Sequence, residues 1–129
     1  MTPSFAATAF AGLLLALSFF QLALAAGAPL GHFAWGGKHR VLPPALRTGS
    51  VVSILLYALM ALVVLAKAGT LSAVPEGVAT IGTWVVVVYS LVGIAVNAIS
   101  RSKPERLAMV PVATVLFVLS LFVALGRPS

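Results

Sequence analysis

The chain has 129 residues, of which 61% are hydrophobic and only 8% are charged. A soluble domain carries about a quarter charged residues to cover its surface, so this composition excludes an ordinary soluble domain and indicates a membrane protein. Eight Lys and Arg against two acidic residues give a net charge of +6, and there is no cysteine. The cations lie in short segments between apolar runs, which is typical of membrane topology rather than of nucleic-acid binding.

Four apolar runs are long enough to cross a bilayer, which takes about 20 residues. They cover residues 4–27, 45–67, 78–99 and 107–126. We therefore predict an all-α integral membrane protein with a single membrane domain over residues 1–129. Its four transmembrane helices are expected to form a compact antiparallel bundle. The Ala-, Val- and Leu-rich composition suggests a bacterial cytoplasmic membrane.

The first run also has features of a signal peptide, because "ALAAG" at residues 23–27 offers small residues to a peptidase. However, no Lys or Arg precedes its apolar core, and the core is longer than that of a signal peptide. We therefore expect a retained helix.

Local signals predict where the helices begin and end. Pro44 suits the first turn of the second helix, where a missing N–H has no consequence. Glu76 is favourable at the start of the third helix, and Gly69 suits the end of the second. "SKPE" predicts a capping box for the fourth helix, in which Ser102 accepts from the Glu105 N–H and the Glu105 carboxylate returns to Ser102.

The basic residues predict an orientation. With four spans, the first and third loops share one side, and they hold Lys38, Arg40, Arg47, Arg101, Lys103 and Arg106. The other side holds Lys67 and Arg127. The positive-inside rule then places both termini outside the cytoplasm and both basic loops inside, in a multi-pass protein of the cell membrane.

Polar residues within the spans gather toward the cytoplasmic side. Gln21, Ser53 and Asn97 form a predicted buried polar cluster. Ser90, Gly93, Asn97 and Arg101 follow the i, i+3, i+7, i+11 spacing of one helix stripe. Such groups either hydrogen-bond between helices or line a polar pocket open to the cytoplasm, and both interpretations can hold together.

The segment 28–44 is longer than a connection between two membrane helices requires. It alternates apolar and basic residues, and we expect it either to lie on the headgroups or to fold back beneath the bundle. Phe33 and Trp35 are predicted interfacial anchors. Gly36 and Gly37 allow a sharp reversal or a close approach of the backbone to a ligand.

Basic residues near two predicted helix starts form a candidate anion site. Arg47 and Arg106 fall in first turns, where the helix dipole disfavours a cation and free N–H groups can hold an anion. The expected site comprises Lys38, Arg40, Arg47, Arg101 and Arg106, and it suits an anionic lipid headgroup, a phosphate or a carboxylate. The alternative is that these cations only set orientation among lipid phosphates.

The catalytic candidates are few. His32 and His39 lack the further ligands that a metal requires, so no metal and no cofactor are expected. Together with Tyr57 they are weak candidates for acid–base chemistry, without a visible partner. Glu76 is expected on the outer side, and Glu105 is expected to be occupied by its capping box.

These features favour a non-enzymatic accessory or binding module for an anionic lipid headgroup or a small anion. The bilayer is its expected environment, with a second copy or a larger membrane protein as further candidate partners. One alternative is a membrane-embedded enzyme that uses the loop histidines on a lipid or isoprenoid-like substrate. Another is an oligomeric uncoupled transporter, because the predicted spans contain no acidic residue for ion coupling.

Overall fold

The computed structural model describes residues 1–126 as an all-helical membrane bundle. The long helices are α1 (Pro3–Ala25), α2 (Pro44–Lys67), α3 (Glu76–Ala98) and α4 (Lys103–Leu125), and each is long and apolar enough to span a membrane. Two short 3-10 helices, η1 (Gly31–Phe33) and η2 (Trp35–Gly37), lie between α1 and α2. The four predicted spans are confirmed, although α4 begins at Lys103 rather than at residue 107.

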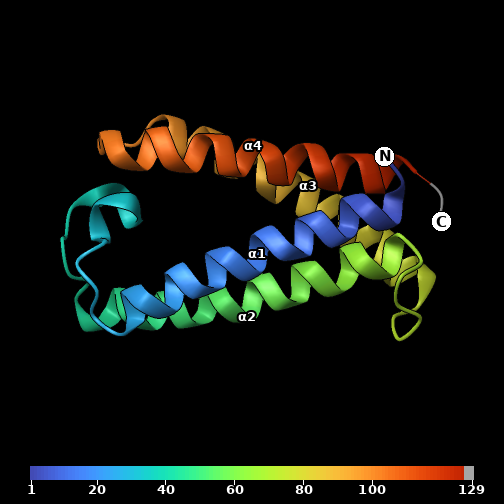
Figure 1. Ribbon diagram of the computed structural model, residues 1–129, viewed down its shortest axis with the longest axis horizontal. Coiled ribbons are helices and arrows are strands. Elements are labelled where there is room, and N and C mark those ends of the chain that lie inside the picture. The colour runs from blue at the N-terminus through green and yellow to red at the C-terminus, as the bar shows by residue number, and fades with distance from the viewer. Residues whose placement is uncertain (127–129) are drawn as a thin grey trace.

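The helices form two hairpins, α1–α2 and α3–α4, which also contact each other along α2–α3 and α1–α4 (Figure 1). The N-terminus, the end of α4 and the connection 68–75 lie at one end of the bundle, here called the termini end. The connections 26–43 and 99–102 lie at the other, the loop end. In Figure 1, α1 and α2 approach α4 at the termini end and diverge from it toward the loop end.

Most helix boundaries follow the predicted local signals. Pro44 lies in the first turn of α2, and Glu76 is the first residue of α3. Gly69 has φ +87° and donates its N–H to Ala66 O at 3.1 Å, which ends α2. Glycine suits this position because an L side chain is strained at such a φ.

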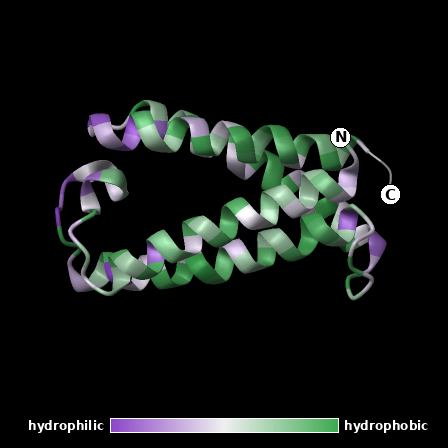
Figure 2. Ribbon diagram, viewed as in Figure 1, coloured by the Kyte–Doolittle hydropathy of each residue, from purple (hydrophilic) through white to green (hydrophobic). Residues whose placement is uncertain are grey.

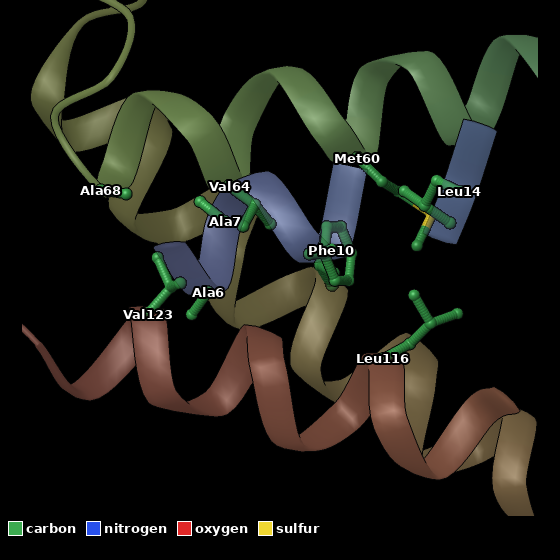
Figure 3. Close-up of a cluster of buried hydrophobic side chains, with 10 residues drawn as sticks. Ala6, Ala7, Phe10, Leu14, Met60, Val64, Ala68, Leu116 and Val123 are labelled. Atoms are coloured by element: carbon green, nitrogen blue, oxygen red, sulfur yellow. The ribbon is translucent and has the colours of Figure 1, made fainter. Parts of the chain in front are cut away.

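The tightly packed part of the bundle lies at the termini end. Phe10 of α1 is fully buried beside Met60 and Val64 of α2 and Leu116 of α4 (Figure 3). Small residues from α1 and α2, including Ala7, complete the cluster. Lipid is as apolar as these side chains, so close van der Waals contact rather than transfer out of water holds the helices together here.

Polar residues are concentrated at the two ends of the bundle, with apolar helix surface between them (Figure 2). Six of the seven Lys and Arg within residues 1–126 lie in or beside the loop-end connections. The seventh, Lys67, ends α2 at the termini end. Arg127, which we expect on the same side of the membrane as Lys67, lies outside the described residues.

Candidate functional site

A cavity of about 320 Å³ lies in the loop-end half of the bundle. Each of the four long helices contributes to its wall, and the loop contributes Phe33, Ala34 and Trp35. Its volume falls at the small end of the range for ligand pockets, about 300–1,000 Å³. The predicted polar cluster lies here, because Gln21, Ser53 and Asn97 all line this cavity.

Two buried polar atoms in the cavity wall have no hydrogen-bond partner among the described residues. Gln21 is only 8% exposed, and its Nε2 donates to the Tyr57 hydroxyl at 3.3 Å, which joins α1 to α2. The Gln21 Oε1 has no partner, and neither has the hydroxyl of Ser90, which is 3% exposed. Most buried polar groups in proteins are paired, so these two mark a place where a water or ligand can bind.

Asn97 does not make the contact between helices that we expected. Its Nδ2 donates to Gly93 O of its own helix at 2.7 Å, and Ser53 likewise donates to Gly49 O at 2.9 Å. The carbonyl four residues earlier is a ready acceptor for a short polar side chain on a helix. Asn97 therefore lines the cavity instead of joining two helices.

The loop between α1 and α2 folds back at the loop end of the bundle (Figure 1), and its residues 33–35 line the cavity. Trp35 donates its indole N–H to the buried Ser50 hydroxyl at 3.2 Å. Its ring lies so close to Gly49 that a Cβ there would be 2.8 Å from a ring carbon. The Trp35 backbone has φ +53°, which bulky residues rarely adopt. The indole contacts hold this strained conformation in place.

The two glycines after Trp35 have different roles. Gly36 donates its N–H to Glu105 Oε2 at 3.3 Å. Gly37 has φ +72°, and a Cβ there would be 2.2 Å from the Ser102 Cβ. The Ser102 hydroxyl in turn donates to the carbonyl of His32. The predicted close approach at the Gly-Gly pair is therefore to the start of α4.

Glu105 differs most from its expected role. The Ser102 hydroxyl accepts from the Glu105 N–H at 3.4 Å, so one half of the capping box forms. The other half is wrong: the Ser102 N–H donates to Ser100 Oγ, and the Glu105 carboxylate accepts from Gly36. Glu105 is 6% exposed and lines the cavity, inside α4. Glu105 lies outside the predicted apolar span 107–126 but inside α4, which begins directly after its N-cap Ser102, as the capping signal predicts.

The two first-turn arginines contact the ends of the preceding helices. Arg47 Nε donates to Leu42 O at 2.8 Å, and its guanidinium lies beside Gly27, just after the end of α1. Arg106 donates to Ser100 O at 2.5 Å, just after the end of α3. The negative ends of α1 and α3 thus compensate these two cations. Of the predicted anion site, Arg47 and Arg106 are therefore engaged within the chain itself.

The remaining basic side chains of the loop end are exposed: Lys38, Arg40, Arg101 and Lys103. None of them lines the cavity. Arg101 lies three residues beyond Ala98, the last residue of α3. Of the predicted stripe, Ser90, Gly93 and Asn97 line the cavity and Arg101 does not.

The three catalytic candidates do not come together in the described part of the chain. Tyr57 lines the cavity, whereas neither histidine does. The His32 ring nitrogen Nδ1 lies 3.2 Å from Gly37 O in the exposed loop, and His39 is partly buried in the same loop. No three His, Cys, Asp or Glu side chains gather within residues 1–126.

Sequence reasoning missed the roles of Glu105 and Ser50. Ser50 was recognisable only as a polar residue near a helix start, and nothing in the sequence pairs it with Trp35. Glu105 stands three residues after Ser102, and this spacing indicates a capping box. Its contact with Gly36 could not be predicted, because that contact depends on how the loop folds.

Comparisons with protein families, curated proteins and solved structures give no match for this chain.

Proposed function

We propose that this chain is a non-enzymatic membrane module whose loop end faces the cytoplasm and binds anionic lipid headgroups. The observation that carries the proposal is the position of four exposed cations, Lys38, Arg40, Arg101 and Lys103, at one end of the bundle. Each basic group at an anionic membrane surface contributes about 1 kcal/mol of attraction.

Two of the six loop-end cations are less suited to bind a headgroup. Arg47 and Arg106 donate to carbonyls of the chain itself and hold the loop end together. Arg101 and Lys103 flank the start of α4 with exposed side chains, which leaves them accessible to a headgroup phosphate.

The orientation is tested with single cysteines, since the chain has none of its own. An impermeant maleimide should label Ser72→Cys in intact cells and should label Lys103→Cys only after the membrane is opened. Both positions are exposed, so unequal labelling reports sidedness rather than burial. Labelling of Lys103→Cys in intact cells would overturn the orientation.

Lipid binding is tested by native mass spectrometry of protein released from vesicles of phosphatidylglycerol and phosphatidylcholine. We expect Arg101→Gln and Lys103→Gln each to lower retention of phosphatidylglycerol about fivefold, the equivalent of about 1 kcal/mol. The effect should shrink in high salt because exposed charges are screened.

Lys67→Gln at the termini end is the matched control and should leave retention unchanged. An equal loss from Lys67→Gln would show only general charge attraction and would contradict a site at the loop end.

A further inference from the structure

The cavity in the loop-end half is not explained by headgroup binding, because none of the exposed cations lines it. We propose that this cavity binds a small amphipathic cation, a protonated amine with a short apolar body. This inference goes beyond the lipid-binding proposal and does not depend on it.

The hydrogen-bonding groups of the wall favour a donor as ligand. Each amide nitrogen already donates one hydrogen bond: Gln21 Nε2 donates to the Tyr57 hydroxyl, and Asn97 Nδ2 donates to Gly93 O. The carbonyl oxygen of Gln21 is buried without a partner. An ammonium group has N–H donors only, so it complements amide oxygens, and the Ser90 hydroxyl can serve as a further acceptor.

The charge in the wall favours a cation. Within residues 1–126, Glu105 is the one acidic residue that lines the cavity, and no Lys, Arg or His of this part of the chain lines it. Glu105 is only 6% exposed, and the described partner of its carboxylate is a single neutral N–H, from Gly36. A buried carboxylate is stabilised by a charged partner, and an ammonium ion would supply one.

The rest of the wall suits the apolar body and the positive charge. Aliphatic side chains such as Leu17, Val112 and Leu116 line the cavity away from the loop. Aromatic rings of Trp35 and Tyr57 lie in the same wall, and ring faces attract cations. A cavity of about 320 Å³ holds a small molecule but not a lipid with two acyl chains.

The probe for the test is hexylammonium, with hexanol as its neutral counterpart of the same chain length. The full-length protein is placed in phosphatidylcholine nanodiscs, whose zwitterionic surface does not concentrate the cation. Trp84→Phe leaves Trp35, which lines the cavity, as the reporting fluorophore. We expect saturable binding of hexylammonium that is about tenfold tighter than that of hexanol, as a charge-assisted contact implies.

Glu105→Gln tests the charge. The glutamine oxygen can still accept from the Gly36 N–H, so the loop contact is kept while the charge is removed. Hexylammonium binding should weaken about tenfold and hexanol binding should stay the same. Glu76→Gln is the matched control, because Glu76 is the other acidic residue of the chain and is exposed at the termini end.

Gly93→Leu tests the location. Gly93 lines the cavity, and a Cβ there meets no atom within 4 Å, so a leucine has room without displacing the backbone. It should abolish binding of both probes. Gly12→Leu, at an exposed position of α1 with equally open space, should leave both unchanged.

Equal affinity for the two probes, or unchanged hexylammonium binding in Glu105→Gln, would overturn the proposal that the site selects a cation. Unchanged binding in Gly93→Leu, or no saturable binding of either probe to the folded protein, would overturn the cavity as the site. The lipid-retention result is independent of each of these outcomes.

Discussion

The two halves of this bundle are built from the same helices but are held together differently. At the termini end, Phe10 and its neighbours fill the space between α1, α2 and α4. The Thr83 hydroxyl of α3 donates to Val63 O of α2 at 3.2 Å, where Gly82 also allows the two helices to approach closely. At the loop end, the same helices enclose a cavity of about 320 Å³.

The difference between the two ends shows what holds the helices of a small bundle in close contact in lipid. Apolar surface alone does not draw helices together in a bilayer, so close packing needs small residues and complementary shapes. At the loop end, the loop itself connects the helices: Trp35 contacts α2, and Gly36 and Gly37 contact the start of α4. The loop end thereby stays open enough for a ligand, while the termini end fixes the arrangement of the helices.

The largest expected effect compares two phenylalanines of α1. Phe10 is fully buried in the tight core, whereas Phe20 is partly buried at the cavity wall. Phe10→Ala should lower the free energy of unfolding in bicelles by about 3–5 kcal/mol, chiefly through the cavity that it leaves. Phe20→Ala should lower it by less than half as much, since Phe20 already borders empty space. Equal losses would contradict the difference in packing.

A smaller effect is expected from the two glycines of the loop. Gly37→Ala combines strain at positive φ with a clash against Ser102, whereas Gly36→Ala has the strain alone because its Cβ meets no atom within 4 Å. Positive-φ strain amounts to about 1–3 kcal/mol. Hydrogen exchange of the Gly31 N–H, which bonds to Arg40 O, should therefore accelerate more in Gly37→Ala than in Gly36→Ala. The same rate in both variants would show that Ser102 does not hold the loop.

The smallest expected effect separates a contact between helices from one within a helix. Gln21→Leu removes the bond to Tyr57 and should lower the free energy of unfolding by about 0.6 kcal/mol, the average for such contacts in membranes. Tyr57→Phe should do the same, and the double variant should lose no more than either single one. Asn97→Leu should change stability less than Gln21→Leu, because its bond lies within α3. A larger loss from Asn97→Leu would place Asn97 in a contact between helices after all.

Much of the architecture could be predicted from the sequence. Hydropathy over stretches of bilayer length determined the four spans, and Pro44, Glu76 and Gly69 marked helix ends because each acts on its own backbone. The stripe of Ser90, Gly93 and Asn97 placed these residues on one face of α3, and all three line the cavity. Helix periodicity is a local property, so the sequence alone carries it.

The site itself depended on contacts between residues far apart in the chain. Glu105 follows a capping pattern, yet its carboxylate accepts from the Gly36 N–H, 69 residues away, while the Ser102 N–H donates to Ser100 Oγ. Arg47 and Arg106 suggested an anion, but the ends of the preceding helices supply the compensating negative charge. The sequence by itself determined the spans, the helix ends and the basic end of the bundle, because these follow from hydropathy and local backbone chemistry. Only the tertiary structure decided which polar groups face the cavity, because a side chain bonds to the partner that folding brings closest.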